Sequence, residues 1–219
     1  MLIESFAAPM FATNCWIIAP APKSECIIVD PGMPDVSHQV EAIIDEFRLK
    51  PVAVVATHGH LDHTFSIQPI ADGYGIPVRI HSEDRRLLAA PQYAHGAEFM
   101  ATLSQMSFSE PREVIEMRNG DVFSLLDLTF TAIHAPGHTR GSVMYVINDE
   151  VLVSGDVLFK GSIGRTDLPT GSHHEMMETL KKKVLPLSDD LRVLTGHGDE
   201  TTIKWERKTN PYLKELQRG

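Results

Sequence analysis

Short apolar runs alternate with segments of helical spacing along this chain. Apolar or alternating runs predict strands at 2–7, 13–19, 26–29, 51–56, 77–80, 128–134, 143–147, 151–153 and 191–194. Apolar residues at helical spacing predict helices at 36–49, 64–74, 173–184 and 201–216, the last broken at Asn210-Pro211. The strand–helix order repeats in two halves, which predicts sheets packed between helices in a single domain.

Two stretches give weaker signals. The segment His81-Ser82-Glu83-Asp84 is expected to start a helix, with Ser82 as its cap. Residues 91–110 are rich in Met, Phe and Ala but lack a clean period, which predicts a helix plus a mobile cover. The Met and Phe side chains of 99–108 are expected in the core or in that cover.

The stretch Thr57-His58-Gly59-His60-Leu61-Asp62-His63 directly follows the strand predicted at 51–56. It places three imidazoles and one carboxylate on a loop between a strand and a helix, where ligands tend to bind in α/β folds. Imidazole and carboxylate together suit zinc, iron or manganese. A loop of solvated histidines is the simplest alternative, and the density of metal-binding side chains argues against it.

Three more predicted strands end in small residues followed by a potential ligand. These residues are His138 after Pro136-Gly137, Asp156 after Gly155, and His197 after Gly196. Glycine permits positive φ and a close approach of the backbone, which a crowded metal site requires. Because the pattern recurs three times, we expect these residues to join the histidine loop in one site.

Seven ligands are too many for one tetrahedral ion, and they divide between two. One ion would be bound by His58, His60 and His138, the other by Asp62, His63 and His197, and Asp156 would bridge both. Two ions about 3.5–4 Å apart can share a hydroxide whose pKa falls toward about 7. The expected cofactors are therefore two divalent metal ions, zinc first, with iron or manganese as alternatives.

Composition narrows the class of protein. The chain has 219 residues and a net charge of −9, which disfavours binding to nucleic acid or to an anionic membrane surface. Cys15 and Cys26 lie in strand-like segments and are expected to be buried and reduced. The sequence shows neither a signal peptide nor a run near 18 apolar residues. We therefore expect a cytoplasmic protein, and the oligomeric state stays open.

The chain carries four motifs in a fixed order: His-x-His-x-Asp-His, Pro-Gly-His, Gly-Asp and Gly-His. In this set and order it resembles the metallo-β-lactamase fold superfamily. The resemblance runs from Asp30-Pro31-Gly32 to about Leu213. It implies an α/β fold, an αββα sandwich that forms one domain over residues 1–219, with a dinuclear site at the edge of the two sheets. It also assigns the role of metal ligand to the seven residues named above.

Within that superfamily, Gly164-Arg165-Thr166-Asp167 resembles the short single-domain glyoxalase II-like hydrolases and also the persulfide dioxygenases. The resemblance implies that Arg165 and Asp167 brace the metal loop. Only 22 residues follow His197, so the separate C-terminal glutathione-binding region of the longer glyoxalase II enzymes is not expected. This predicts a more open site or a different thiol carrier.

The leading hypothesis is a metal-dependent hydrolase of glyoxalase II type that cleaves a small-molecule thioester, such as an acylglutathione, with a metal-bound hydroxide. Asp62 is expected to orient the hydroxide and to pass on its proton. The alternative is a persulfide dioxygenase-like oxidoreductase with one iron on His58, His138 and Asp156. A metal-stabilised binding module is disfavoured, because structural sites close with about four ligands.

Other polar residues carry weaker expectations. Lys204 and Arg207 follow the His197 loop and are candidates for binding an anionic substrate. His134 is expected to be a core or supporting histidine, whereas His38 and His95 are expected to be solvated.

Overall fold

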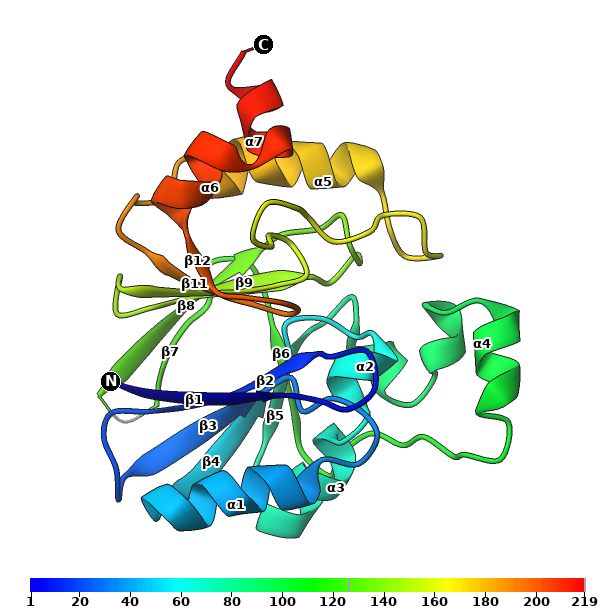
Figure 1. The fold of residues 1–219 in the computed structure, drawn as a ribbon. Coiled ribbons are helices and arrows are strands. Elements are labelled where there is room, and N and C mark those ends of the chain that lie inside the picture. The colour runs from blue at the N-terminus through cyan, green and yellow to red at the C-terminus, as the bar shows by residue number, and fades with distance from the viewer. Residues whose placement is uncertain (126, 219) are drawn as a thin grey trace.

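The computed structural model describes residues 1–125 and 127–218, which form two six-stranded sheets packed face to face (Figure 1). In spatial order the first sheet contains β1 (Leu2–Ala7), β2 (Asn14–Ala19), β3 (Glu25–Val29), β4 (Lys50–Val55), β5 (Val78–His81) and β6 (Val114–Met117). The second contains β12 (Thr201–Thr202), β11 (Arg192–Thr195), β10 (Val151–Gly155), β9 (Val143–Ile147), β8 (Leu128–His134) and β7 (Val122–Leu125).

Helices cover the outer face of each sheet, so the predicted αββα sandwich is confirmed (Figure 1). The first sheet is covered by α1 (Ser37–Phe47) and α3 (Ile67–Tyr74), and the second by α5 (His173–Thr179), α6 (Ile203–Thr209) and α7 (Pro211–Leu216). The short α2 (Leu61–Thr64) lies at the end of β4, and α4 (Ala97–Thr102) projects at one side of the molecule. Within the described residues, no helix combines the length and the apolar character needed to cross a membrane.

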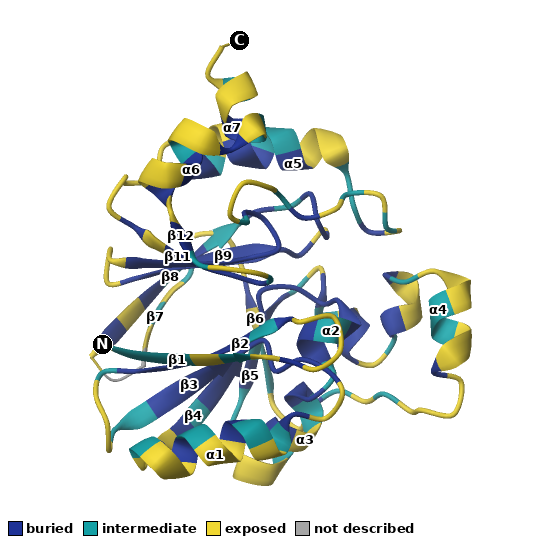
Figure 2. Ribbon diagram, in the orientation of Figure 1, coloured by how far each residue is buried: buried dark blue, intermediate teal, exposed yellow. Residues whose placement is uncertain are grey.

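The apolar residues of the strands form layers on both faces of each sheet (Figure 2). Along β4, for example, Ala53 and Val55 pack between the sheets, whereas Val54 packs toward the helices. Successive strand side chains point to opposite faces, so a strand buried on both sides reads as one continuous apolar run. Both cysteines lie in these layers, buried and unpaired.

Strand direction brings the loops that carry the candidate ligands to one edge of the sandwich. In the first sheet β3, β4 and β5 are parallel neighbours, so their carboxyl ends lie together. In the second sheet β8 and β10 both pair antiparallel with β9, and β10 runs parallel to β11. In the second sheet β8, β10 and β11 therefore run in the same direction, so their carboxyl ends lie at one edge. The loops that follow these strands meet the loop that follows β4.

Two local predictions are corrected. Ser82 caps no helix, because residues 82–84 form a turn and a 3₁₀ turn at Arg85–Leu88 follows, with Asp84 at its N-cap position. The helix predicted at 64–74 is two helices, and the first already begins at Leu61. Asp62 and His63 therefore lie on α2, and only His58 and His60 precede it on the loop.

Candidate metal centre

The loop after β4 is held by a buried carboxylate at the end of β3. Asp30 accepts hydrogen bonds from the Thr57 backbone N–H at 2.8 Å and from the Thr57 hydroxyl at 2.6 Å. Since β3 and β4 are parallel neighbours, these two hydrogen bonds join their carboxyl ends. They thereby fix the position of the backbone from which His58 and His60 follow.

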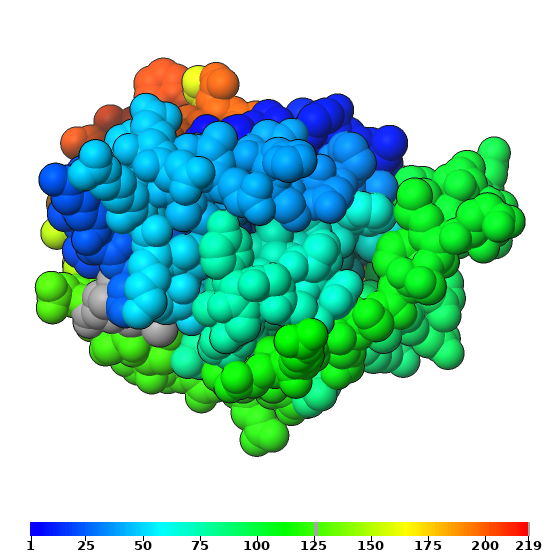
Figure 3. Space-filling view, turned by 90° about the horizontal axis from the view of Figure 1, so that it is seen from below, coloured from blue at the N-terminus to red at the C-terminus, as the bar shows by residue number. Residues whose placement is uncertain are grey.

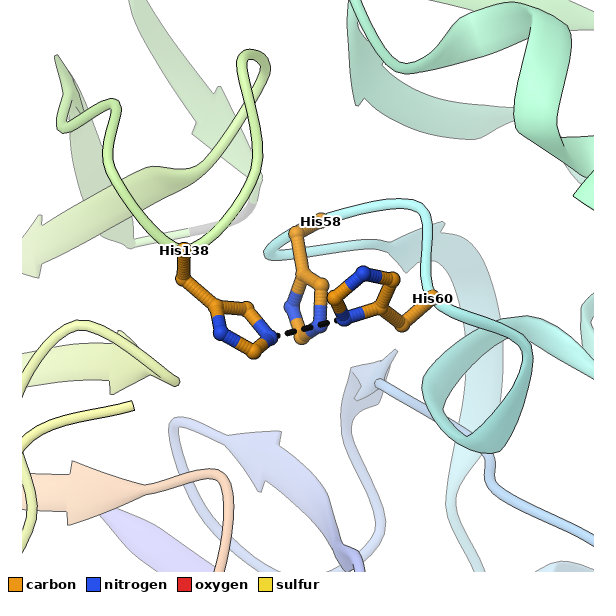
Figure 4. Close-up of side chains that lie close together, drawn as sticks. All are labelled: His58, His60 and His138. Carbon is orange, nitrogen blue, oxygen red and sulfur yellow. Dashed lines mark hydrogen bonds between the residues drawn. The ribbon is translucent and has the colours of Figure 1, made fainter. Parts of the chain in front are cut away.

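A first group of three buried imidazoles meets at this edge (Figure 4). His58 and His60 come from the loop after β4, and His138 comes from the loop after β8. His60 Nδ1 and His138 Nε2 are 2.7 Å apart, and the three side chains are 1–3% exposed. Three imidazoles without water around them form a site for one cation.

A second group lies beside the first and contains Asp62, His63 and His197. Nε2 of His63 lies 3.2 Å from Nε2 of His197, and Asp62 Oδ2 lies 3.4 Å from Nε2 of His197. His197 arrives on the loop after β11, which connects this group to the second sheet.

Asp156, at the end of β10, lies between the two groups. Its Oδ2 is 3.4 Å from Nε2 of His138 in the first group and 3.5 Å from Nε2 of His197 in the second. Its Oδ1 is 3.3 Å from Nε2 of His63. The structure therefore brings all seven predicted ligands together, in the two groups expected and with this carboxylate in reach of both.

Unpartnered nitrogen atoms show that the residues fit a bound cation. Nε2 of His58 and Nε2 of His60 are buried without a hydrogen-bond partner among the described residues. A buried polar atom left in this state costs about 1–3 kcal/mol, and metal coordination would remove that cost. Imidazole and carboxylate donors suit zinc, iron or manganese.

Hydrogen bonds at the far side of three imidazoles fix how these rings face the centre. His63 Nδ1 lies 2.9 Å from Asp30 Oδ2. His138 Nδ1 lies 2.7 Å from the carbonyl oxygen of Arg165, and His197 Nδ1 lies 3.0 Å from that of Phe11. An oxygen of this kind accepts the proton on Nδ1, so Nε2 is the atom presented to the centre.

The two predicted bracing residues contribute differently from expectation. Arg165 supports His138 through its backbone carbonyl, whereas its guanidinium donates to Asp167 at 2.8 and 2.7 Å. Both side chains are largely exposed. Asp167 therefore acts on the loop through Arg165 and not through a metal ligand.

The two candidate substrate-binding residues, Lys204 and Arg207, lie away from the centre. Arg207 donates to the carbonyl of Leu187 at 2.7 Å and pairs with Asp189 at 3.2 Å. Neither Lys204 nor Arg207 lines the cavity above the metal centre. Both residues lie on α6, where Lys204 is exposed and Arg207 is half-buried against the chain before β11.

Sequence reasoning missed two residues that hold the ligand loops. Asp84 is fully buried and accepts from the backbone N–H groups of Gly59 and Gly141, each at 2.8 Å, and from the Thr139 hydroxyl at 2.6 Å. It thereby ties the loop after β4 to the loop after β8. The other is Asp30, which comes directly after β3. Both are acidic residues that follow a strand, but neither is preceded by glycine, so the pattern that pointed to Asp156 does not include them.

The prediction that His95 is solvated is wrong. Its side chain is half-buried and its Nε2 accepts the Leu61 backbone N–H at 2.9 Å. Its neighbour Ala94 is fully buried, so the chain turns inward here and brings the ring over the metal loop.

A cavity of about 480 Å³ opens above the two groups. Its lining is Phe11, His60, Asp62, His95, Gly96, Phe99, His138, Asp156, Phe159, Arg165, Leu168 and His197. The floor is polar and carries candidate ligands, whereas the walls are mainly aromatic and aliphatic. A small organic molecule with one polar reacting group matches this division.

The two groups hold protons differently in the metal-free protein. Burial lowers the pKa values of His58 and His60 well below 6.5. Burial also lowers the pKa of His63, but the carboxylates of Asp156, Asp62 and Asp30 outweigh it and raise that pKa well above 6.5. For His197, burial is outweighed by hydrogen bonds to Asp156 and Asp62, which raise the pKa to about 9.

Metal affinity at the second group is therefore expected to rise with pH up to about 9, because a cation must displace the protons of His63 and His197. The same protons stabilise the metal-free fold below pH 6.5, the usual histidine pKa, and that stability is lost as pH rises through 9. Titration calorimetry with Zn²⁺ in buffers of different ionisation heat counts the protons released. Equal proton release for the first and second ion would contradict this assignment.

Comparison with known proteins adds independent information. The sequence profile of the Metallo-beta-lactamase superfamily matches residues 8–197. An uncharacterized protein of Mycobacterium leprae is 42% identical, covering 99% of this chain and all of its own length. The hydroxyacylglutathione hydrolase GloC of Haemophilus influenzae is 32% identical, over 97% of this chain and 98% of its own.

Solved structures agree with these matches. The B3 metallo-beta-lactamase BLEG-1 superposes with a TM-score of 0.84 at 31% identity, over 97% of this chain and 99% of its own. TTHA1623 in a di-iron-bound form superposes with a TM-score of 0.77 at 29% identity, over 97% and 100%. The fold is thus shared over nearly the whole length of this chain and of both solved structures.

Proposed function

This chain belongs to the metallo-β-lactamase superfamily of metallo-hydrolases, and from that premise we propose that it hydrolyses a small-molecule thioester in the manner of glyoxalase II. The observation that carries the proposal is the pair of ligand groups joined by Asp156 at the floor of an apolar cavity. The similarity to GloC over nearly the full length of both chains supports the same reaction class.

The seven predicted ligands would hold two divalent ions, and we propose zinc for both. His58, His60 and His138 would hold one ion, Asp62, His63 and His197 the other, and Asp156 would contact both. Such ions supply Lewis acidity, which polarises a carbonyl and lowers the pKa of water toward neutrality. Each residue's contribution is to fix the position and protonation of its own donor atom.

We propose that Asp62 holds the attacking water and takes its proton. Its Oδ2 is already engaged, accepting from the Thr13 hydroxyl at 3.1 Å and lying near His63 and His197. Its Oδ1 makes no hydrogen bond within the described part of the chain, so it can accept from a water in the cavity it lines. Although burial opposes it, the neighbouring His63 and a hydrogen bond to His197 keep the pKa of Asp62 below its usual value. The carboxylate is thus ionised at neutral pH.

A thioester suits this site better than a substrate with a poor leaving group. A thiolate leaves with little acid assistance, so this reaction does not depend on a proton donor in the cavity wall. Cys15 and Cys26 are buried in the sheet layers, so the reaction proceeds without a cysteine nucleophile. We propose a cytoplasmic location, a compartment in which such thiols stay reduced.

The thiol carrier is open to more than glutathione. Among the described residues that line the cavity, Arg165 is the only lysine or arginine, and its guanidinium is bonded to Asp167. A carrier with free carboxylates therefore gains little electrostatic attraction here. We propose that the site accepts uncharged acyl thioesters as well as acylglutathione.

We keep a second candidate function, a persulfide dioxygenase-like oxidoreductase that uses one iron. Iron as the metal is supported by TTHA1623, 29% identical, whose structure is a di-iron-bound form and so holds two such ions. His58, His138 and Asp156 are the two imidazoles and one carboxylate that would hold a single iron in a persulfide dioxygenase-like enzyme. His138 and Asp156 lie within 3.4 Å of each other, so this arrangement uses the same side chains.

The deciding experiment measures metal content and product together. Protein purified without added metal is assayed by elemental analysis, then with S-lactoylglutathione and with an N-acetylcysteamine thioester of the same acyl group, by release of free thiol. We expect two ions per chain and cleavage of both thioesters. One iron per chain, intact thioesters and oxygen consumption with glutathione persulfide would reject the hydrolase in favour of the dioxygenase.

A further inference from the structure

His95 contacts the metal loop although it comes from a segment that carries no candidate ligand. It lies between a 3₁₀ turn at Pro91–Tyr93 and α4, on the part of the chain that projects at one side of the molecule (Figures 1 and 3). The centroid of its ring lies 5.1 Å from that of His60 and 5.2 Å from that of Phe99, and the ring lines the cavity.

The hydrogen bond of His95 determines which of its nitrogens carries the proton. Nε2 lies 2.9 Å from the backbone nitrogen of Leu61, and a backbone N–H can only donate. Nε2 is therefore the acceptor, and the ring proton is on Nδ1. The contact is thus a directed bond to the main chain and not a chance approach of two rings.

Within residues 1–125 and 127–218, the Leu61 N–H has no hydrogen-bond acceptor other than His95. Leu61 is the first residue of α2, where an N–H has no helix carbonyl to bind, and the His60 side chain at the N-cap makes no capping bond. With His95 in place Leu61 is only 2% exposed, so this N–H depends on His95 and not on solvent for its hydrogen bond. The next two residues of this helix are Asp62 and His63.

The same segment also holds the side chain of Leu61. Leu61 packs in one apolar cluster with Leu103, which follows α4, and with Met33. His95 is therefore fixed between two buried anchors, Ala94 before it and Leu103 after it. The backbone and the side chain of Leu61 are both held by residues 94–103.

We propose that His95 is a positioning residue of the metal centre. By accepting the Leu61 N–H, it sets the rotation of α2 and hence where Asp62 and His63 point, while its ring supports that of His60. It couples the projecting α4 segment to the ligands without binding a metal itself. The proposal rests on the metal-dependent function proposed above.

A pair of substitutions separates the effect of the hydrogen bond between His95 and Leu61 from the effect of side-chain size at position 95. In His95→Gln the side-chain carbonyl reaches the place of Nε2 and can still accept the Leu61 N–H, whereas the shorter side chain of His95→Asn cannot. Affinity for Zn²⁺ is measured by competition with a chromophoric chelator, and the absorption spectrum of the Co²⁺-loaded protein reports ligand geometry. Tyr93→Ala, an exposed change on the same segment, is the control.

We expect His95→Asn to lower Zn²⁺ affinity about 10- to 100-fold and to alter the Co²⁺ spectrum, the range found for residues that orient metal ligands. His95→Gln and Tyr93→Ala should remain close to the wild type. Wild-type affinity in His95→Asn, or equal losses in His95→Asn and His95→Gln, would overturn the proposal. If His95→Asn fails to fold, a loss of affinity in folded His95→Gln as large as 10-fold would overturn it, and retained affinity would support it.

None of these readouts uses catalysis. A wild type that binds two ions but cleaves no thioester rejects the proposed substrate class and leaves the role of His95 intact. A wild type that binds no divalent ion rejects both.

Discussion

Substitution of Asp156 by alanine is expected to lower the affinity for both ions at once and to abolish thioester cleavage. Asp156 is the one predicted ligand whose carboxylate lies within 3.5 Å of a histidine from each group. Its loss also removes a negative charge that lies 3.3 Å from Nε2 of His63 and 3.4 Å from Nε2 of His138. We expect metal affinity to fall by more than about 100-fold, the upper limit for residues that merely orient ligands. Elemental analysis after dialysis and thiol release measure the two effects.

Two further variants serve as controls for the Asp156→Ala result. Asp167→Ala removes a carboxylate from the same region, but this side chain is exposed and bonds Arg165, so metal content should be unchanged. His60→Ala should abolish cleavage. The second group, Asp62, His63 and His197, does not include His60 and should still bind an ion. Retention of two ions by Asp156→Ala would disprove a bridging role for this carboxylate.

Substitution of Gly196 by alanine, a change of one methyl group, is expected to disrupt the centre nearly as severely. A Cβ at Gly196 would lie 2.0 Å from Oδ1 of Asp156 and 2.9 Å from Cε1 of His63. The backbone cannot move away freely, because the Gly196 N–H donates to the Gly155 carbonyl and the Gly196 carbonyl accepts from the Asn14 N–H. We expect a loss of stability of about 1–3 kcal/mol and loss of both ions.

Gly73→Ala is the matched control. Gly73 lies in α3, and a Cβ there would meet nothing within 4 Å. Alanine in a helix is favoured over glycine by roughly 0.5–1 kcal/mol, so this variant should be as stable as the wild type or slightly more stable. Thermal unfolding and metal content together test the pair. Full metal content in Gly196→Ala would show that the loops around Asp156 and His63 can shift, contrary to the close packing described here.

The sequence by itself determined most of the strands, though not β6, β7 or β12, together with the fold class and the identity of the candidate ligands. The run 51–56 reads as a strand buried on both faces, and the structure places β4 there between two apolar layers. His138, Asp156 and His197 were recognised because each follows an apolar strand and a glycine. This works because the signal is local: a strand end, a flexible residue and a metal-binding side chain are adjacent in the chain.

Contacts between distant segments were decided only by the tertiary structure. Asp84, 25 residues beyond Gly59 and 57 before Gly141, binds the main chain of both loops. His95 reaches Leu61 across 34 residues. In contrast, Lys204 and Arg207 lie close to His197 in sequence but away from the cavity. Every residue except proline carries the same backbone N–H, so periodicity and motif spacing cannot show which N–H donates to a distant side chain. The packing of the two sheets and their loops determines that partner.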